Sequence, residues 1–149
     1  MRWIALVGIC LSATTIAALG EDNIVSVERG FQIAKDGTCH ECHTVGYYRR
    51  SQRINPATAF RGSTEKYIGP WGTVYPNNIR LVVRGMTEDD FVRYASALVG
   101  LGPMTYFANY LRALSESDKR SLYQYVKSLG ESGEKEPTAT APDGQPLTK

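Results

Sequence analysis

Two cysteines and a histidine stand close together in the segment Cys39-His40-Glu41-Cys42-His43. Side chains three and four residues apart share one face of a helical turn, so Cys39, Cys42 and His43 can all reach one planar ligand. The Cys-x-x-Cys-His spacing is the attachment signature of a c-type haem. In such a site the two thiols form thioethers with the porphyrin, and the imidazole binds the iron. The motif therefore predicts one covalently bound haem c.

Two other kinds of site also use cysteines at this spacing. A structural zinc ion needs about four nitrogen or sulfur ligands, but beyond the motif the sequence supplies only a distant Cys10 and no second cysteine pair. A thioredoxin-like redox motif requires a βαβ context, and the sequence around residues 39–43 does not indicate one. Covalent haem is therefore the interpretation that we adopt.

A methionine thioether commonly occupies the second axial position of such an iron. Of the three methionines, Met1 belongs to an N-terminal segment that we expect to be removed. Met86 precedes a helix start at Thr87 and packs there as part of a hydrophobic staple. Met104 falls in a predicted loop without such a role, so we expect it to be the distal ligand. A filled sixth position leaves little room for O₂, which favours electron transfer over enzymatic oxygen chemistry.

Residues 1–20 have the features of a secretory signal that is cleaved: Arg2, an apolar run over residues 3–11 and small residues near residue 20. The apolar run is shorter than the ~20 residues of a membrane span, so we expect a mature protein that does not span the membrane. An uncleaved anchor is the alternative. Covalent haem attachment takes place outside the cytoplasm in bacteria, so the predicted location is the periplasm.

Three stretches show helical patterning. The first carries Ile24, Val27, Phe31 and Ala34 at spacings of three and four. Within it Gly30 costs about 1 kcal/mol relative to alanine, so we expect another helix to cross there at close range.

The second helix begins at Thr87, where Asp90 completes a capping pattern, and the third begins near Ser115 with Asp118 in the same relation. Their expected core stripes are Phe91, Tyr94, Ala95 and Leu98, and then Leu122, Tyr125, Val126 and Leu129.

The rest of the sequence lacks such periods. Residues 44–67 are basic and partly aromatic, which indicates a solvated loop or, alternatively, a positive docking surface. Residues 69–79 form a turn-rich segment in which Trp71, Tyr75 and Asn78 are candidate haem contacts, with simple packing as the alternative. Residues 131–149 have the composition of a disordered tail, whose removal we expect to leave stability nearly unaltered. The net charge of +2 gives no argument for nucleic-acid binding.

The motif with its flanking threonines, the helix containing Gly30, the late Met104 and the last helix with Tyr123 and Tyr125 together resemble class I cytochromes c over most of residues 22–130. More narrowly, five segments are similar to one module of the cytochrome c subunits of membrane-bound bacterial alcohol and gluconate dehydrogenases: residues 29–30, 72–79, 87–91, 103–104 and 114–118. Those subunits usually carry three modules, whereas this chain carries one motif.

The resemblance implies an all-α small cytochrome c fold over residues 21–130, with three to five helices around the haem and the first and last helices crossing near Gly30 and Tyr125. It assigns the thioethers to Cys39 and Cys42, the proximal ligand to His43 and the distal ligand to Met104. In many members a proline carbonyl orients the proximal imidazole.

Pro70 matches the position of that proline in one alignment with the family, because Pro70 follows Gly69 as the proline of the family often follows a glycine. A second alignment, which matches residues 72–79 to a different segment of the dehydrogenase modules, conflicts with this one. Both alignments stay open.

The predicted function is that of a periplasmic one-electron carrier whose partners are redox proteins: a donor dehydrogenase or quinol-oxidising complex and a terminal acceptor. One alternative is a fixed cytochrome subunit of an exported dehydrogenase. A second alternative is a haem-based sensor of CO or NO.

Overall fold

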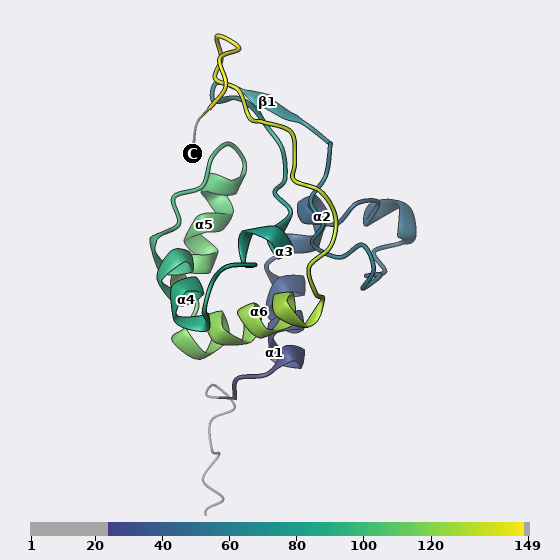
Figure 1. Ribbon diagram of the computed structural model, residues 1–149, viewed down its shortest axis with the longest axis vertical. Coiled ribbons are helices and arrows are strands. Elements are labelled where there is room, and N and C mark those ends of the chain that lie inside the picture. Colours follow the sequence, from purple (N-terminus) through teal and green to yellow (C-terminus); the bar gives the residue numbers. More distant parts are fainter. Residues whose placement is uncertain (1–23, 148–149) are drawn as a thin grey trace, which may run out of the picture.

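The structure is a computed structural model that describes residues 24–147, so the predicted signal at residues 1–20 lies outside the described part (Figure 1). The described chain is mainly helical, as predicted, and adds one short antiparallel hairpin. Its elements are α1 (Val27–Asp36), α2 (Cys39–His43), the short 3₁₀ turn η2 (Tyr48–Arg50), β1 (Tyr67–Gly69), β2 (Gly72–Val74), α3 (Ile79–Val82), α4 (Glu88–Ala97), α5 (Met104–Ala113) and α6 (Glu116–Ser128).

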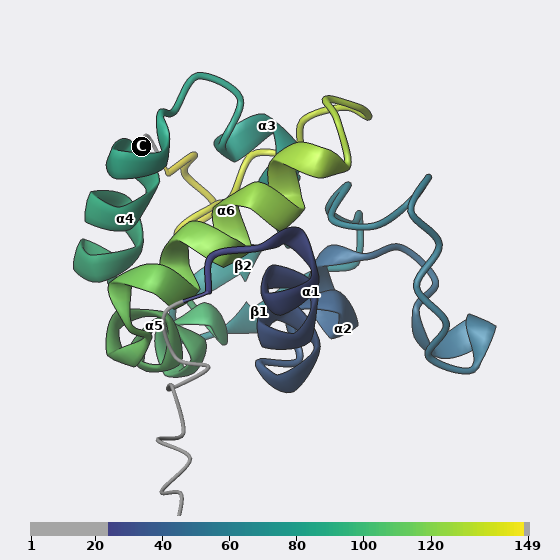
Figure 2. The ribbon, with the colours of Figure 1, turned by 90° about the horizontal axis from the view of Figure 1, so that it is seen from below.

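The first and last helices, α1 and α6, cross at Gly30 (Figures 1 and 2). A Cβ atom at Gly30 would lie 2.0 Å from the backbone oxygen of Ser121 and 2.7 Å from Cβ of Tyr125. No side chain fits in that space, so a mid-helix glycine is required where the two backbones meet. The expected close crossing near Gly30 and Tyr125 is confirmed.

The crossing also sets which face of α1 is buried. Ile33 and Ala34 lie one turn after Gly30 on the same side of the helix and are 2% and 0% exposed. Ile24 precedes the first turn of α1 and is 64% exposed, and Val27 is 44% exposed. The predicted stripe was therefore correct at Ala34 but wrong at its N-terminal end. There the chain meets α6 through polar contacts, from the Ser26 N–H to the Ser121 hydroxyl and from Arg29 to Asp118, and not through apolar packing.

The caps of α4 and α6 form as predicted. The Thr87 hydroxyl accepts from the Asp90 N–H, and the Asp90 carboxylate accepts from the Thr87 N–H, which completes a capping box. Ser115 caps α6 by accepting from the N–H of Asp118 at 3.1 Å. Both helices then pack into a core of buried side chains that includes Phe91, Ala95, Leu122, Tyr125 and Val126, with the partly buried Met86 against it.

Helix α5 is a departure from the sequence prediction. Met104, expected in a loop, is the first residue of this helix, and Pro103 precedes it at the cap position. Gly100 and Gly102 adopt positive φ values of 77° and 59° and reverse the chain between α4 and α5. The sequence prediction missed this helix because Gly100, Gly102 and Pro103 indicate a loop, although Met104, Phe107, Ala108 and Leu111 recur at helical spacing.

Residues 131–147, the described part of the segment predicted to be a disordered tail, make ordered contacts in the structure. This segment returns past α3 to the hairpin (Figure 1, yellow), where Thr140 and Thr73 exchange two backbone hydrogen bonds of 2.8 and 2.9 Å. The side-chain amide of Asn78 donates to the carbonyls of Ser132 and Glu134. These are polar backbone contacts that need no hydrophobic pattern, so composition could not reveal them. The folded unit extends well beyond residue 130.

Residues 45–66 form an irregular loop that projects beside α2 (Figures 1 and 2). Its tip turns through Ser51 and Gln52, which have positive φ values, and its arginines Arg49, Arg50 and Arg53 are exposed. Among residues 24–147, no helix combines the length and apolar character that crossing a membrane requires.

Candidate functional site

Helix α2 is one short helical turn that consists of the Cys-x-x-Cys-His motif itself. Thr38 enters it in a left-handed conformation with φ of 53°, directly after Gly37, the residue that caps the C-terminal end of α1. The structure thereby places Cys39, Cys42 and His43 at helical spacing, as the sequence predicts, and both cysteines are free thiols. Burial raises the pKa of the Cys39 thiol to about 12. A thioredoxin-like nucleophile has a depressed pKa instead, so the surroundings of Cys39 disfavour that alternative.

The imidazole of His43 is oriented by a backbone carbonyl. Its Nδ1 lies 2.8 Å from the oxygen of Asn77. Because that oxygen can only accept, Nδ1 carries the proton and the lone pair of Nε2 is left for a ligand bond. Burial lowers the pKa of His43, against the hydrogen bond to Asn77 and the nearby negative charge of Glu136, which both raise it. A neutral imidazole with a fixed tautomer is the form that binds a metal.

The sequence did not identify Asn77 as the residue whose carbonyl orients His43. Pro70 was the residue considered for that role. Pro70 is exposed in the turn between β1 and β2, whereas Asn77 lies between β2 and α3. The only available signal was the run of turn-forming residues over 69–79, which identifies the segment but not the carbonyl.

His40, the other histidine of the motif, has a structural role. Its side chain is 1% exposed and stacks on Phe60 with ring centroids 4.3 Å apart. Nδ1 lies 2.8 Å from the Thr44 hydroxyl, and Nε2 lies 3.3 Å from the Tyr125 hydroxyl. Both ring nitrogens are therefore occupied, which leaves His43 as the histidine that can bind a metal. Within residues 24–147 no three His, Cys, Asp or Glu side chains gather as a metal site would require.

The hairpin β1–β2 connects the motif with the start of α5. Tyr67 on β1 donates its hydroxyl hydrogen to the sulfur of Cys42 at 3.3 Å. Trp71, in the turn of the hairpin, packs against the segment before Met104: a Cβ atom at Gly102 would lie 2.9 Å from the indole Nε1 and 2.9 Å from Cγ2 of Val74. Gly102 therefore lets the hairpin approach the turn that leads to Met104.

The other end of α5 packs against the segment that precedes the motif. The Tyr110 hydroxyl donates to the carbonyl of Ile33 at 3.2 Å, and its ring leaves no space for a side chain at Gly37. Helix α5 is thus held at Trp71 near its first residue, Met104, and at α1 near Cys39. The sequence had to place Met104 by elimination, and the structure now adds the contacts that hold its helix beside the motif.

Trp71 provides a test of whether the site fits a haem. Its indole N–H is buried and has no hydrogen-bond partner in the described part of the chain. An unsatisfied buried donor costs about 1–3 kcal/mol, so a native protein is expected to supply an acceptor. A carboxylate on a bound cofactor beside the hairpin and α5 would be one, which fits a haem propionate.

The remaining candidate contacts differ from Trp71. Tyr75 is half-buried just after β2, and its contact with a haem stays a prediction. Asn78 is 0% exposed and uses its side chain to cap α3 at Leu81 and to hold the tail. Its predicted contact with the haem is not needed to explain its burial.

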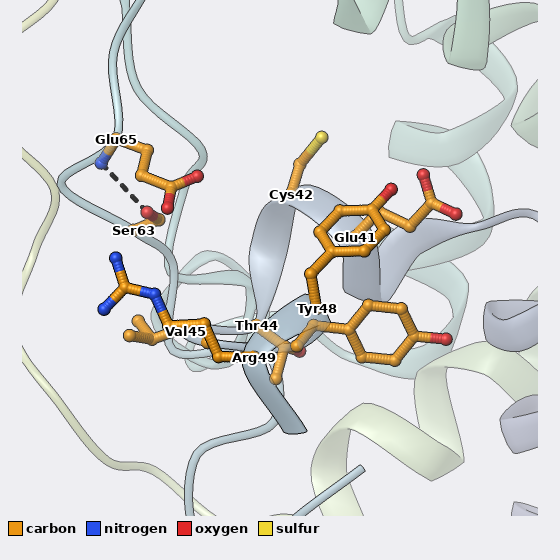
Figure 3. Close-up of a pocket in the computed structure, with 10 residues that line it drawn as sticks. Glu41, Cys42, Thr44, Val45, Tyr48, Arg49, Ser63 and Glu65 are labelled. Carbon is orange, nitrogen blue, oxygen red and sulfur yellow. Dashed lines mark hydrogen bonds between the residues drawn. The ribbon is translucent and has the colours of Figure 1, made fainter. Parts of the chain in front are cut away.

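A small pocket of about 90 Å³ lies beside Cys42 (Figure 3). It opens between the end of α2 and the basic loop, with Tyr48 and Arg49 on one wall and Ser63 and Glu65 on another. Neither His43 nor Met104 lines it, so Cys42 is the one residue of the proposed haem-binding set that this pocket includes.

Comparison of the chain with protein-family models, with curated proteins and with solved structures gave no match.

Proposed function

We propose that this protein is a monohaem c-type cytochrome that carries single electrons between redox proteins in the periplasm. The observation that carries the proposal is the bond from His43 Nδ1 to the Asn77 carbonyl. His43 is the histidine that follows both cysteines of the motif, and this hydrogen bond leaves its Nε2 atom free. A partly buried, oriented and neutral imidazole beside two free thiols supplies the groups that attach a covalent haem and bind its iron from the motif.

Each residue of the candidate site has a defined role in this proposal. Cys39 and Cys42 would hold the haem through thioethers, and His43 and Met104 would be the two ligands of its iron. The haem supplies an iron that gains and loses one electron. Trp71 would donate its buried indole N–H to a propionate. With two iron ligands supplied by the chain, the site would favour electron transfer over the binding of a small molecule.

Periplasmic location and the partner classes follow from this assignment and are part of the proposal. Haem is attached to such motifs outside the cytoplasm, so the protein is exported. Its partners are then a donor dehydrogenase or quinol-oxidising complex and a terminal acceptor. Copurification with a large cofactor-bearing chain would instead identify it as a fixed subunit of a dehydrogenase.

The test compares the wild type with Met104→Ala and Met86→Ala, each produced in a host that attaches haem c. We expect the oxidised wild type and Met86→Ala to show the weak sulfur-to-iron charge-transfer band, because Met86 only packs against the core. Met104→Ala should keep its covalent haem, lose the band and bind CO when reduced. Retention of the band in Met104→Ala would refute the ligand assignment. Ready CO binding by the wild type would favour a gas sensor.

A further inference from the structure

One peptide unit beside the candidate iron ligand is hydrogen-bonded on both sides. The carbonyl of Asn77 accepts from His43 Nδ1 at 2.8 Å. The N–H of Asn78, which belongs to the same peptide bond, donates to the carboxylate Oε2 of Glu136 at 3.1 Å. A carboxylate from the C-terminal segment is therefore connected to the imidazole of His43 through a single amide group.

The position of Glu136 in this chain of bonds is held by the surrounding segment. The buried side chain of Asn78 donates to the carbonyls of Ser132 and Glu134 at 2.9 and 3.1 Å. Gly133 passes so close that a Cβ atom there would lie 2.9 Å from Nδ2 of Asn78, and its φ of +86° suits glycine. These contacts fix residues 132–134 against α3 and bring Glu136, which is half-buried, onto the Asn78 N–H.

Hydrogen bonds in series polarise one another. A carboxylate that accepts from an amide N–H forms a charge-assisted bond and draws positive charge toward that end of the amide. The carbonyl oxygen at the other end then becomes a stronger acceptor and draws the Nδ1 proton more firmly. An imidazole whose proton is held in this way donates more electron density to a metal, as carboxylates do for metal-bound histidines.

We propose that Glu136 is a positioning residue that acts through the 77–78 peptide to strengthen the His43 hydrogen bond and to lower the reduction potential of the haem. This inference rests on the proposed function, since it concerns the iron that His43 binds. It gives the C-terminal segment a task beyond packing: its carboxylate stabilises the ferric state relative to the ferrous state.

The matched pair of variants is Glu136→Gln and Glu134→Gln, both in the haem-loaded full chain. Each removes one negative charge from the same segment. The glutamine at position 136 can still accept from the Asn78 N–H, so the segment stays in place. The side chain of Glu134 is exposed, and only its backbone carbonyl contacts Asn78, so this variant reports the effect of charge alone.

Spectroelectrochemistry gives the first readout. We expect Glu136→Gln to raise the ratio of reduced to oxidised protein at a fixed potential by about threefold to tenfold, equivalent to about 30–60 mV for one electron. Glu134→Gln should change the ratio much less. Proton NMR of the diamagnetic ferrous protein gives the second readout: the His43 Nδ1 and Asn78 amide protons should move upfield in Glu136→Gln only.

Equal shifts of potential in the two variants, or unmoved His43 and Asn78 protons in Glu136→Gln, would overturn the role of the peptide and leave the proposed function intact. A chain that acquires no haem in a competent host would overturn the proposed function, and this inference with it.

Discussion

Replacing Gly30 by alanine should separate the two central helices. The added Cβ atom would lie 2.0 Å from the oxygen and 2.5 Å from the carbonyl carbon of Ser121. Both atoms are backbone, so neither can rotate away, and α1 and α6 must move apart. Overpacking typically costs about 1–3 kcal/mol, and the rigid backbone places this site at or above the upper end. Alanine recovers about 1 kcal/mol of helix propensity. We therefore expect a net loss of about 2 kcal/mol.

The matched control is Gly85→Ala. Nothing lies within 4 Å of a Cβ atom at Gly85, so this change should be neutral or stabilise by up to about 1 kcal/mol through the unfolded chain. Urea denaturation of the haem-loaded proteins, followed by circular dichroism of the helices, gives both values. A Gly30→Ala protein as stable as the Gly85→Ala protein would refute the crossing geometry.

Two further predictions concern stability. Deleting residues 131–149 should lower the unfolding free energy by about 2 kcal/mol. It removes five hydrogen bonds at Asn78 and Thr73, worth about 1 kcal/mol each, and the conformational entropy that the ordered segment no longer loses offsets part of this. Thermal unfolding of the truncated and full chains tests this, and equal midpoints would contradict it. Burial lowers the pKa of His40 to about 4, below its unfolded value of about 6.5. The unfolded state therefore binds the proton more tightly than the folded state. The contribution of neutral His40 to the free energy of unfolding should be fully present above pH 6.5, and the free energy of unfolding should fall by up to about 3 kcal/mol as the pH drops to 4. Urea titrations at several pH values should show this slope in the wild type and lose it in His40→Gln, and an unchanged slope in that variant would assign it to other groups.

The local features of the fold were the ones that sequence could predict. Capping at Thr87 and Ser115 depends on side chains and backbone within four residues, so the sequence contains the whole interaction. The need for Gly30 was also visible, because a mid-helix glycine is unfavourable unless another backbone comes close. The identity of that backbone came only from the resemblance to cytochromes c.

The features that the sequence could not reveal depend on backbone atoms brought together from distant parts of the chain. Every non-proline residue has the same N–H and C=O, so nothing in residues 69–79 distinguishes the Asn77 carbonyl as the partner of His43. The attachment of Thr140 to β2 is of the same kind. Helix α5 was missed for a different reason: the glycines and the proline just before it indicated a loop, although its own apolar residues recur at helical spacing.

The most direct test of the account is the mass of the tryptic peptide of residues 36–49, taken from protein produced in a host that attaches haem c. This peptide contains Cys39, Cys42 and His43 and ends at Arg49. The account predicts a peptide that is heavier by one haem and that absorbs in the visible range. An unmodified peptide with two free thiols would contradict it.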